Sequence, residues 1–144
     1  MYKHILLPTD GSELSKAAMN HGIELAKAIG ARVTAMVVST PLTSLVVDPS
    51  RVSGALEQYK ALVAEQTAKY LDNIRNNAGM AGVDCVTLCI EHEKPYEAIV
   101  DTAKNRGCDL VVMASHGLRG VSAILGSETL KVLTHTSIPI LVYR

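Results

Sequence analysis

Residues 2–12 read YKHILLPTDGS and give the first indication of the fold. Its first part, Tyr2–Leu7, predicts a buried strand, and the five residues that follow are of the kinds that favour turns and helix caps. Beyond them, apolar residues recur at helical spacing from Leu14 to Ile29. Gly30 is expected to end that helix in a left-handed conformation. The stretch therefore predicts a strand–turn–helix unit.

The same alternation of strands and helices continues along the sequence. After a second strand at Arg32–Ser39, the residues Thr40–Ser50 carry two prolines and no regular period, which predicts a long loop suited to a lid or a partner contact. A long amphipathic helix is expected from Val52 to an end near Asn77–Gly82. Further strands are expected at Val83–Ile90, Leu110–Met113 and Pro139–Tyr143, and further helices at Pro95–Gly107 and Ser127–His135.

This order of elements predicts the α/β class, with an open five-stranded parallel sheet and helices on both faces. Nearly continuous apolar strands, such as residues 110–113 and 138–142, are typical of strands buried on both sides. In open sheets of this type, ligands bind beyond the carboxyl ends of the strands, where the strand order reverses. We therefore expect the functional site at the tips that follow Leu7, Val38 and Met113.

Length and composition narrow the classes of protein further. The 144 residues predict a single domain over residues 1–144. The formal net charge is zero, with 14 basic and 14 acidic residues, which argues against a general attraction to nucleic acid or to an anionic membrane. No apolar run approaches the roughly 18 residues of a membrane span. A cytoplasmic location is the resulting expectation.

The three cysteines, Cys85, Cys89 and Cys108, cannot all pair within one chain, which favours a reducing compartment. Cys85 and Cys89 lie four residues apart in a predicted strand and so share one face, where we expect them to pack as small hydrophobic residues. Cys89 together with His92 resembles half of a metal site, but no second ligand pair follows at a useful spacing. We therefore predict no metal centre.

Glycines cluster after the fourth predicted strand, where residues 113–120 read MASHGLRG and Gly126-Ser127 precede the last helix. Glycines allow backbone N–H groups to approach a phosphate closely, and a helix N-terminus adds unpaired donors. The hydroxyls of Ser127 and Thr129 are expected to add further donors. A positive φ is expected at Gly126, which a β-branched residue at this position would resist. Read without a ligand, the same residues are ordinary turn and cap glycines. No Gly-Lys-Ser/Thr motif is present, so this is not a Walker loop.

Three separated motifs resemble the universal stress protein family over essentially the whole chain. They are the opening ILLPTDGS at residues 5–12, MASHG with GSET at residues 113–117 and 126–129, and SIPILV at residues 137–142. The resemblance implies a Rossmann-like fold of the adenine nucleotide alpha hydrolase-like type. It also implies adenine-nucleotide binding, usually a homodimer, and a role in stress survival.

Carried over to this sequence, the resemblance implies that Asp10 accepts hydrogen bonds from the ribose hydroxyls and that Val38 packs against adenine. Met113 would lie beneath the nucleotide, and the loop and helix glycines would hold the phosphates. Each role has a structural alternative: Asp10 also fits a cap of the first helix, and Val38 and Met113 also fit plain core positions. The candidate nucleotide-binding residues are Pro8, Thr9, Asp10, Val38, Met113, Ala114, His116, Gly117, Gly126, Ser127, Glu128 and Thr129.

The sequence departs from the family pattern of Gly-x-x-Gly, nine residues, then Gly-Ser/Thr at two places. Ala114 replaces the first glycine, which is tolerable if φ is negative there, and eight residues rather than nine (Leu118–Leu125) separate Gly117 from Gly126. Either Gly120 absorbs the shorter loop or phosphate binding is impaired.

Two hypotheses for the function follow. The first is a stress-response regulator that binds ATP, with or without Mg²⁺, and whose occupancy sets its conformation or its binding of an unknown protein partner. The second is a dimeric interaction or chaperone-like module with a vestigial pocket.

At most weak ATP hydrolysis is expected, because no nucleophile accompanies His116. We expect the His116 side chain to shape its loop. Homodimerisation is expected through the strand Ile138–Val142 at an edge of the sheet.

Overall fold

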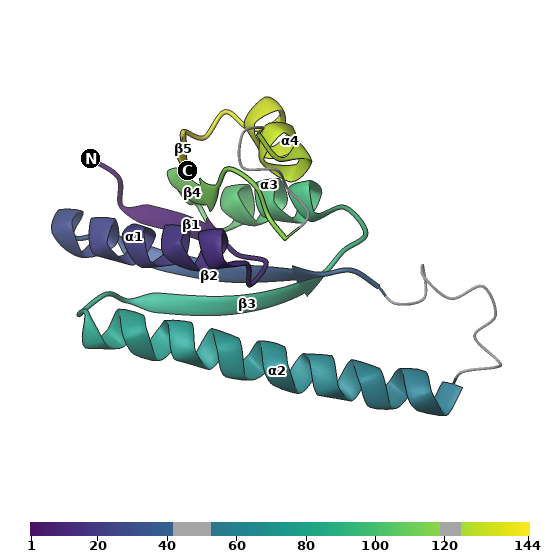
Figure 1. The fold of residues 1–144 in the computed structure, drawn as a ribbon. Coiled ribbons are helices and arrows are strands. Elements are labelled where there is room, and N and C mark those ends of the chain that lie inside the picture. Colours follow the sequence, from purple (N-terminus) through teal and green to yellow (C-terminus); the bar gives the residue numbers. More distant parts are fainter. Residues whose placement is uncertain (42–52, 119–124) are drawn as a thin grey trace.

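The computed structural model describes residues 1–41, 53–118 and 125–144 and contains one parallel sheet. The strand order is β3-β2-β1-β4-β5, which confirms the predicted α/β fold (Figure 1). The chain runs outward from β1 through β2 to β3 and then returns to place β4 on the other side of β1. The order therefore reverses between β1 and β4. The strands are β1 (His4–Pro8), β2 (Arg32–Ser39), β3 (Cys85–Glu91), β4 (Leu110–Ala114) and β5 (Ile140–Tyr143).

Two helices cover each face of the sheet, as Figure 1 shows. Side chains alternate along β1, so Ile5 and Leu7 pack against the first two helices and Leu6 packs against the last two. All five residues of β1 are buried, as expected for the central strand of a parallel sheet. The helices are α1 (Glu13–Ile29), α2 (Ser53–Met80), α3 (Pro95–Asn105) and α4 (Ser127–His135).

Helix α1 begins and ends as the sequence predicts in general terms. Its N-cap is Ser12, whose hydroxyl accepts the N–H of Ser15 at 3.3 Å. The alternative role of Asp10 as the cap of this helix is therefore wrong. Gly30 ends the helix with a φ of +70°, which confirms the predicted left-handed cap.

Helix α2 is buried only along its second half. Leu71, Ile74 and Ala78 pack in the core, whereas Tyr59 and Leu62 are 54% and 52% exposed. The helix is about 42 Å long and the neighbouring seven-residue strand about 23 Å, so the helix extends past the sheet (Figure 1). The predicted start at Val52, and most of the predicted loop Thr40–Ser50, lie outside the described residues.

The cysteines differ from one another. Cys108 is buried, and Cys85 packs against the core, but Cys89 is exposed on the edge strand β3, so the expectation that it packs is wrong. All three thiols are free. Within the described ranges, no helix combines the length and the apolar character that a membrane span requires.

Candidate functional site

A cavity of about 570 Å³ opens at the carboxyl ends of β1, β2 and β4, where the strand order reverses. This volume lies in the range of small-molecule pockets. The cavity is lined by all twelve candidate residues, which the sequence placed on four separate segments, so the structure brings them together. Six further lining residues escaped the sequence analysis: Ser15, Met36, Thr40, Pro95, Ile99 and Leu118.

Asp10 presents a carboxylate at the tip of β1. Its Oδ1 accepts the N–H of Ser12 at 3.0 Å, and its Oδ2 accepts the N–H of Leu118 at 3.0 Å, so the residue links the β1 tip to the segment after β4. Burial raises the pKa of the Asp10 carboxyl. Hydrogen bonds from Ser12, Leu118 and Ser15 lower the pKa by more than burial raises it, so the pKa lies below its usual range. The group is therefore an ionised acceptor at neutral pH.

Thr9 supports this tip rather than presenting a free hydroxyl. Its Oγ1 lies 3.0 Å from the Ser15 hydroxyl and 2.8 Å from the Tyr70 hydroxyl, and it accepts the N–H of Gly11 at 3.2 Å. A hydroxyl offers one donor and two acceptor positions, so these three contacts use its capacity. Thr9 thereby ties α1 and α2 to the cavity wall.

The two glycines of the predicted phosphate site are needed for space. A Cβ on Gly126 would lie 3.0 Å from Cα of His116 and 3.1 Å from the Ser115 carbonyl oxygen, and a Cβ on Gly117 would collide with Oδ2 of Asp10. Neither glycine has a positive φ, and Gly126 has a φ of −62°, so the expectation of a positive φ there is wrong. Ala114 also has a negative φ, because no described residue other than glycine has a positive one.

The start of α4 offers fewer free donors than the sequence suggests. The N–H of Gly126 donates to the Ser115 carbonyl at 2.6 Å, and the hydroxyl of Thr129 donates to the Ala114 carbonyl at 2.8 Å. These contacts hold the loop to the helix and leave the N–H groups of the first turn, with the Ser127 hydroxyl, as donors toward the cavity. The expectation that Thr129 supplies a free donor is therefore wrong.

The segment between β4 and α4 is described only in part, and His116 lies in the described part. His116 lines the cavity, and its Nδ1 lies 3.1 Å from the Ser115 hydroxyl, which fits a role in shaping the loop. Gly120 and most of the shortened segment Leu118–Leu125 lie outside the described residues. Among the described residues, no group of three or more His, Cys, Asp or Glu side chains is placed to hold a metal ion.

Apolar walls complete the cavity. Met113 is buried, and both Met113 and Val38 pack in the core on the side of α3 and α4 while also lining the cavity. Met36 and Ile99 add further apolar surface. A flat, weakly polar ring suits such walls, and sugar hydroxyls and an anionic group suit the acceptor at Asp10 and the donors of α4. The residues present therefore fit a nucleotide.

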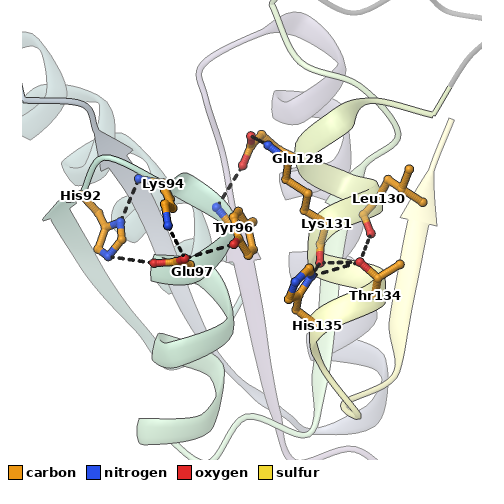
Figure 2. Close-up of polar contacts among 9 residues, drawn as sticks. All are labelled: His92, Lys94, Tyr96, Glu97, Glu128, Leu130, Lys131, Thr134 and His135. Atoms are coloured by element: carbon orange, nitrogen blue, oxygen red, sulfur yellow. Dashed lines mark hydrogen bonds and ion pairs between the residues drawn. The ribbon is translucent and has the colours of Figure 1, made fainter. Parts of the chain in front are cut away.

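Glu128 connects α4 to α3 at the rim of this cavity. Its Oε2 accepts the N–H of Tyr96 at 3.0 Å, and its Oε1 lies 3.4 Å from Nζ of Lys131, as Figure 2 shows for the first contact. Tyr96 lies in the first turn of α3 and Glu128 in the first turn of α4, so the two helix N-termini meet here. The carboxylate thus fixes the spacing of two walls of the cavity.

Comparisons with known proteins agree with this geometry. A sequence model described as the Universal stress protein family matches residues 1–144. Universal stress protein MJ0531 of Methanocaldococcus jannaschii is 33% identical over 147 residues, which cover 100% of this chain and 83% of the relative. The solved structure of protein MJ0577 of the same organism is 28% identical, with a TM-score of 0.80 and coverage of 99% of this chain and 96% of that one.

Other solved structures share the fold at lower identity. Universal stress protein UspA from Lactobacillus plantarum has a TM-score of 0.85 at 24% identity and covers 99% and 98% of the two chains. A universal stress protein in complex with cAMP has a TM-score of 0.71 at 21% identity (99% and 97% covered), and one from Archaeoglobus fulgidus in complex with dAMP has 0.63 at 18% (99% and 98%). The family model spans every residue of the chain. The chain therefore belongs to the universal stress protein family.

Proposed function

We propose that this chain is a stress-response regulator that binds ATP in the cavity and whose nucleotide occupancy sets its conformation or its choice of partner. The observation that carries the proposal is the cavity at the strand-order reversal, with the Asp10 carboxylate on one side and the start of α4 on the other. Fold relatives solved with cAMP and dAMP support an adenine nucleotide as the ligand class.

Asp10 would recognise the ribose. A carboxylate has about four lone-pair positions, and two of those of Asp10 are used by the N–H groups of Ser12 and Leu118. The side chains of Ser12 and Ser15 also hydrogen-bond this carboxylate, and a pair of neighbouring ribose hydroxyls would replace them there. The existing bonds also fix the orientation of the carboxylate before a ligand arrives, which reduces the entropic cost of binding.

The start of α4 would hold the phosphates. Its first-turn N–H groups and the Ser127 hydroxyl provide donors, and the helix dipole favours negative charge at this end. Mg²⁺, when bound with the nucleotide, supplies positive charge that offsets the phosphates, and Glu128 is the carboxylate on this side of the cavity that is placed to share it.

Titration calorimetry and thermal unfolding test the proposal. We expect ATP to release heat and to raise the melting temperature through its preferential binding to the folded chain, with ADP weaker and GTP weaker still. Nucleotide recovered from the purified protein after denaturation would give independent support. If millimolar ATP gives neither heat nor thermal stabilisation, the ATP proposal fails.

A dimeric interaction module with a vestigial pocket is the second candidate, and one observation favours it. Strand β5 is at an edge of the sheet, and Leu141 on this strand is 42% exposed. Leu130 and Leu133 on α4 are 48% and 47% exposed. An apolar edge strand invites pairing with a second copy. Either candidate thus includes a homodimer through β5.

Sedimentation tests the dimer directly. We expect the wild type to sediment as a dimer at micromolar concentration and Leu141→Lys to sediment as a monomer, because a buried lysine would lack a partner. Lys104→Leu at an exposed position of α3 is not expected to change the association. A wild type that is monomeric at this concentration would contradict the dimer.

We place the protein in the cytoplasm in this proposal, since three free thiols suit a reducing compartment.

A further inference from the structure

The carboxylate of Glu128 lies in the cavity for a structural reason that does not require its charge. The N-cap of α3 is Lys94, whose side chain makes no capping bond, and Pro95 has no N–H. The N–H groups of Glu97 and Ala98 donate to the Lys94 carbonyl. The N–H of Tyr96 is the donor of this turn that Glu128 accepts (Figure 2). A neutral amide oxygen at the same position would also accept this bond, although more weakly than a carboxylate.

The charge of Glu128 nevertheless acts on the cavity. The residue directly follows Ser127 and lines the same cavity, so its carboxylate would add negative potential where the first turn of α4 holds an anion. Among the described residues that line the cavity, the formally charged side chains are Asp10 and Glu128, and both are negative. Lys131 offsets this charge in part, at 3.4 Å from Oε1, but both partners of the pair are about half exposed and so are screened by water.

We propose that Glu128 discriminates among ligands by their phosphate charge: its carboxylate disfavours metal-free ATP, so that the triphosphate binds with Mg²⁺. This inference rests on the proposed nucleotide site and adds the residue that sets its selectivity. A neutral nucleoside meets no repulsion from Glu128, and the repulsion grows with each phosphate charge. Mg²⁺ would reverse the balance, because it would add positive charge beside the phosphates and Glu128 would be a carboxylate near enough to help hold it.

Glu128→Gln isolates the charge, because glutamine keeps an oxygen for the Tyr96 N–H. With one charge removed next to the phosphates in a partly exposed site, we expect metal-free ATP to bind about tenfold more tightly. Adenosine is expected to bind as it does to the wild type. Millimolar Mg²⁺ is expected to shrink the difference between the variant and the wild type for ATP.

Calorimetry on the full chain, with adenosine, AMP and ATP in EDTA and then in Mg²⁺, makes this comparison. The matched control is Glu65→Gln on α2, which makes the same change in net charge at an exposed ion pair with Lys69. We expect this control to bind every ligand as the wild type does. A gain in the control equal to that in Glu128→Gln would show a general charge effect and would overturn the inference.

A second variant keeps the test decisive if Glu128→Gln folds poorly. Lys131→Gln removes the partner that offsets Glu128, so metal-free ATP is expected to bind several-fold more weakly and adenosine unchanged. Equal affinities of the wild type and both variants for ATP in EDTA overturn the role of Glu128 and leave the proposed function standing. If neither adenosine, AMP nor ATP binds any folded variant, the proposed function itself fails, and the inference with it.

Discussion

The two ends of the cavity are built from different parts of the chain. At the acceptor end, meaning Thr9 and Asp10 at the tip of β1, the group offered to a ligand is a side-chain carboxylate held by two backbone N–H groups. At the donor end, meaning Gly126–Glu128 at the start of α4, the groups offered are mainly backbone N–H groups. The acceptor end is therefore broken by removing a side chain, and the donor end by adding one.

The largest expected effect is that of Gly126→Val at the donor end. The added side chain begins 3.0 Å from Cα of His116 and 3.1 Å from the Ser115 carbonyl oxygen, so backbone must shift to admit it, and we expect the unfolding free energy to fall by about 1–3 kcal/mol and ATP binding to be lost. Urea unfolding and calorimetry measure the two effects. Gly79→Val is the control, because no atom lies within 4 Å of its added Cβ. Wild-type stability and affinity in Gly126→Val would show that the donor end is not limited by space.

A smaller effect is expected from Asp10→Ala at the acceptor end. Loss of the carboxylate leaves ribose hydroxyls without their acceptor, and we expect ATP to bind about five- to a hundredfold more weakly, which corresponds to about 1–3 kcal/mol. Asp101→Ala, at an exposed position of α3, is the control and is expected to keep the wild-type affinity. An Asp10→Ala variant that binds ATP like the wild type would remove ribose recognition from this end.

The pH dependence of stability sharpens the same prediction. The folded pKa of Asp10 lies below its unfolded value of about 3.9, because hydrogen bonds to the carboxylate outweigh its burial. The stabilisation is therefore fully present above the unfolded pKa and is lost as the pH falls through the folded pKa. We expect the stability difference between wild type and Asp10→Ala to be constant from pH 7 to about 5 and to shrink below pH 4. A difference that stays constant down to pH 2 would contradict this assignment.

Smaller still is the effect expected from the thiols, which belong to neither end. Replacing Cys85 and Cys108 by Val and Cys89 by Ser should keep the fold and the ATP affinity, because none of the three lines the cavity. Burial raises the pKa of the Cys108 thiol to about 11, so at pH 8 alkylation should label exposed Cys89 well before Cys108. Mass spectrometry gives the order of labelling. Faster labelling of Cys108, or weaker ATP binding by the thiol-free variant, would count against these assignments.

A similarly small effect is expected from Ala114→Gly, which restores the first glycine of the family pattern. Ala114 lies at the end of β4 with a negative φ, so glycine relieves no strain there. We expect the ATP affinity to change less than twofold in calorimetry. A large gain would show that the alanine methyl blocks the phosphates, and the donor end would then be impaired in this chain.

The sequence predicted the order of the elements, the parallel sheet and twelve of the eighteen described residues that line the cavity, because strand tips of such a sheet meet at one edge and the family motifs fall on those tips. It could not predict which polar groups are already used. Thr129 and Gly126 donate to carbonyls of the preceding loop, and these bonds depend on how α4 packs on β4. Ser15 and Ile99 escaped notice because they lie inside helices, where a pattern of spacing predicts burial but not proximity to a ligand.

The hydrogen bond between Tyr70 and Thr9 has a spectroscopic consequence. The chain has five tyrosines and no tryptophan, so its near-ultraviolet circular dichroism and its intrinsic emission come from tyrosine. Tyr70 carries one of these chromophores on α2, and its hydroxyl lies 2.8 Å from a residue of the cavity wall. A ligand that shifts Thr9 therefore changes the environment of Tyr70, so ligand binding is expected to change the tyrosine circular dichroism or emission without an added label.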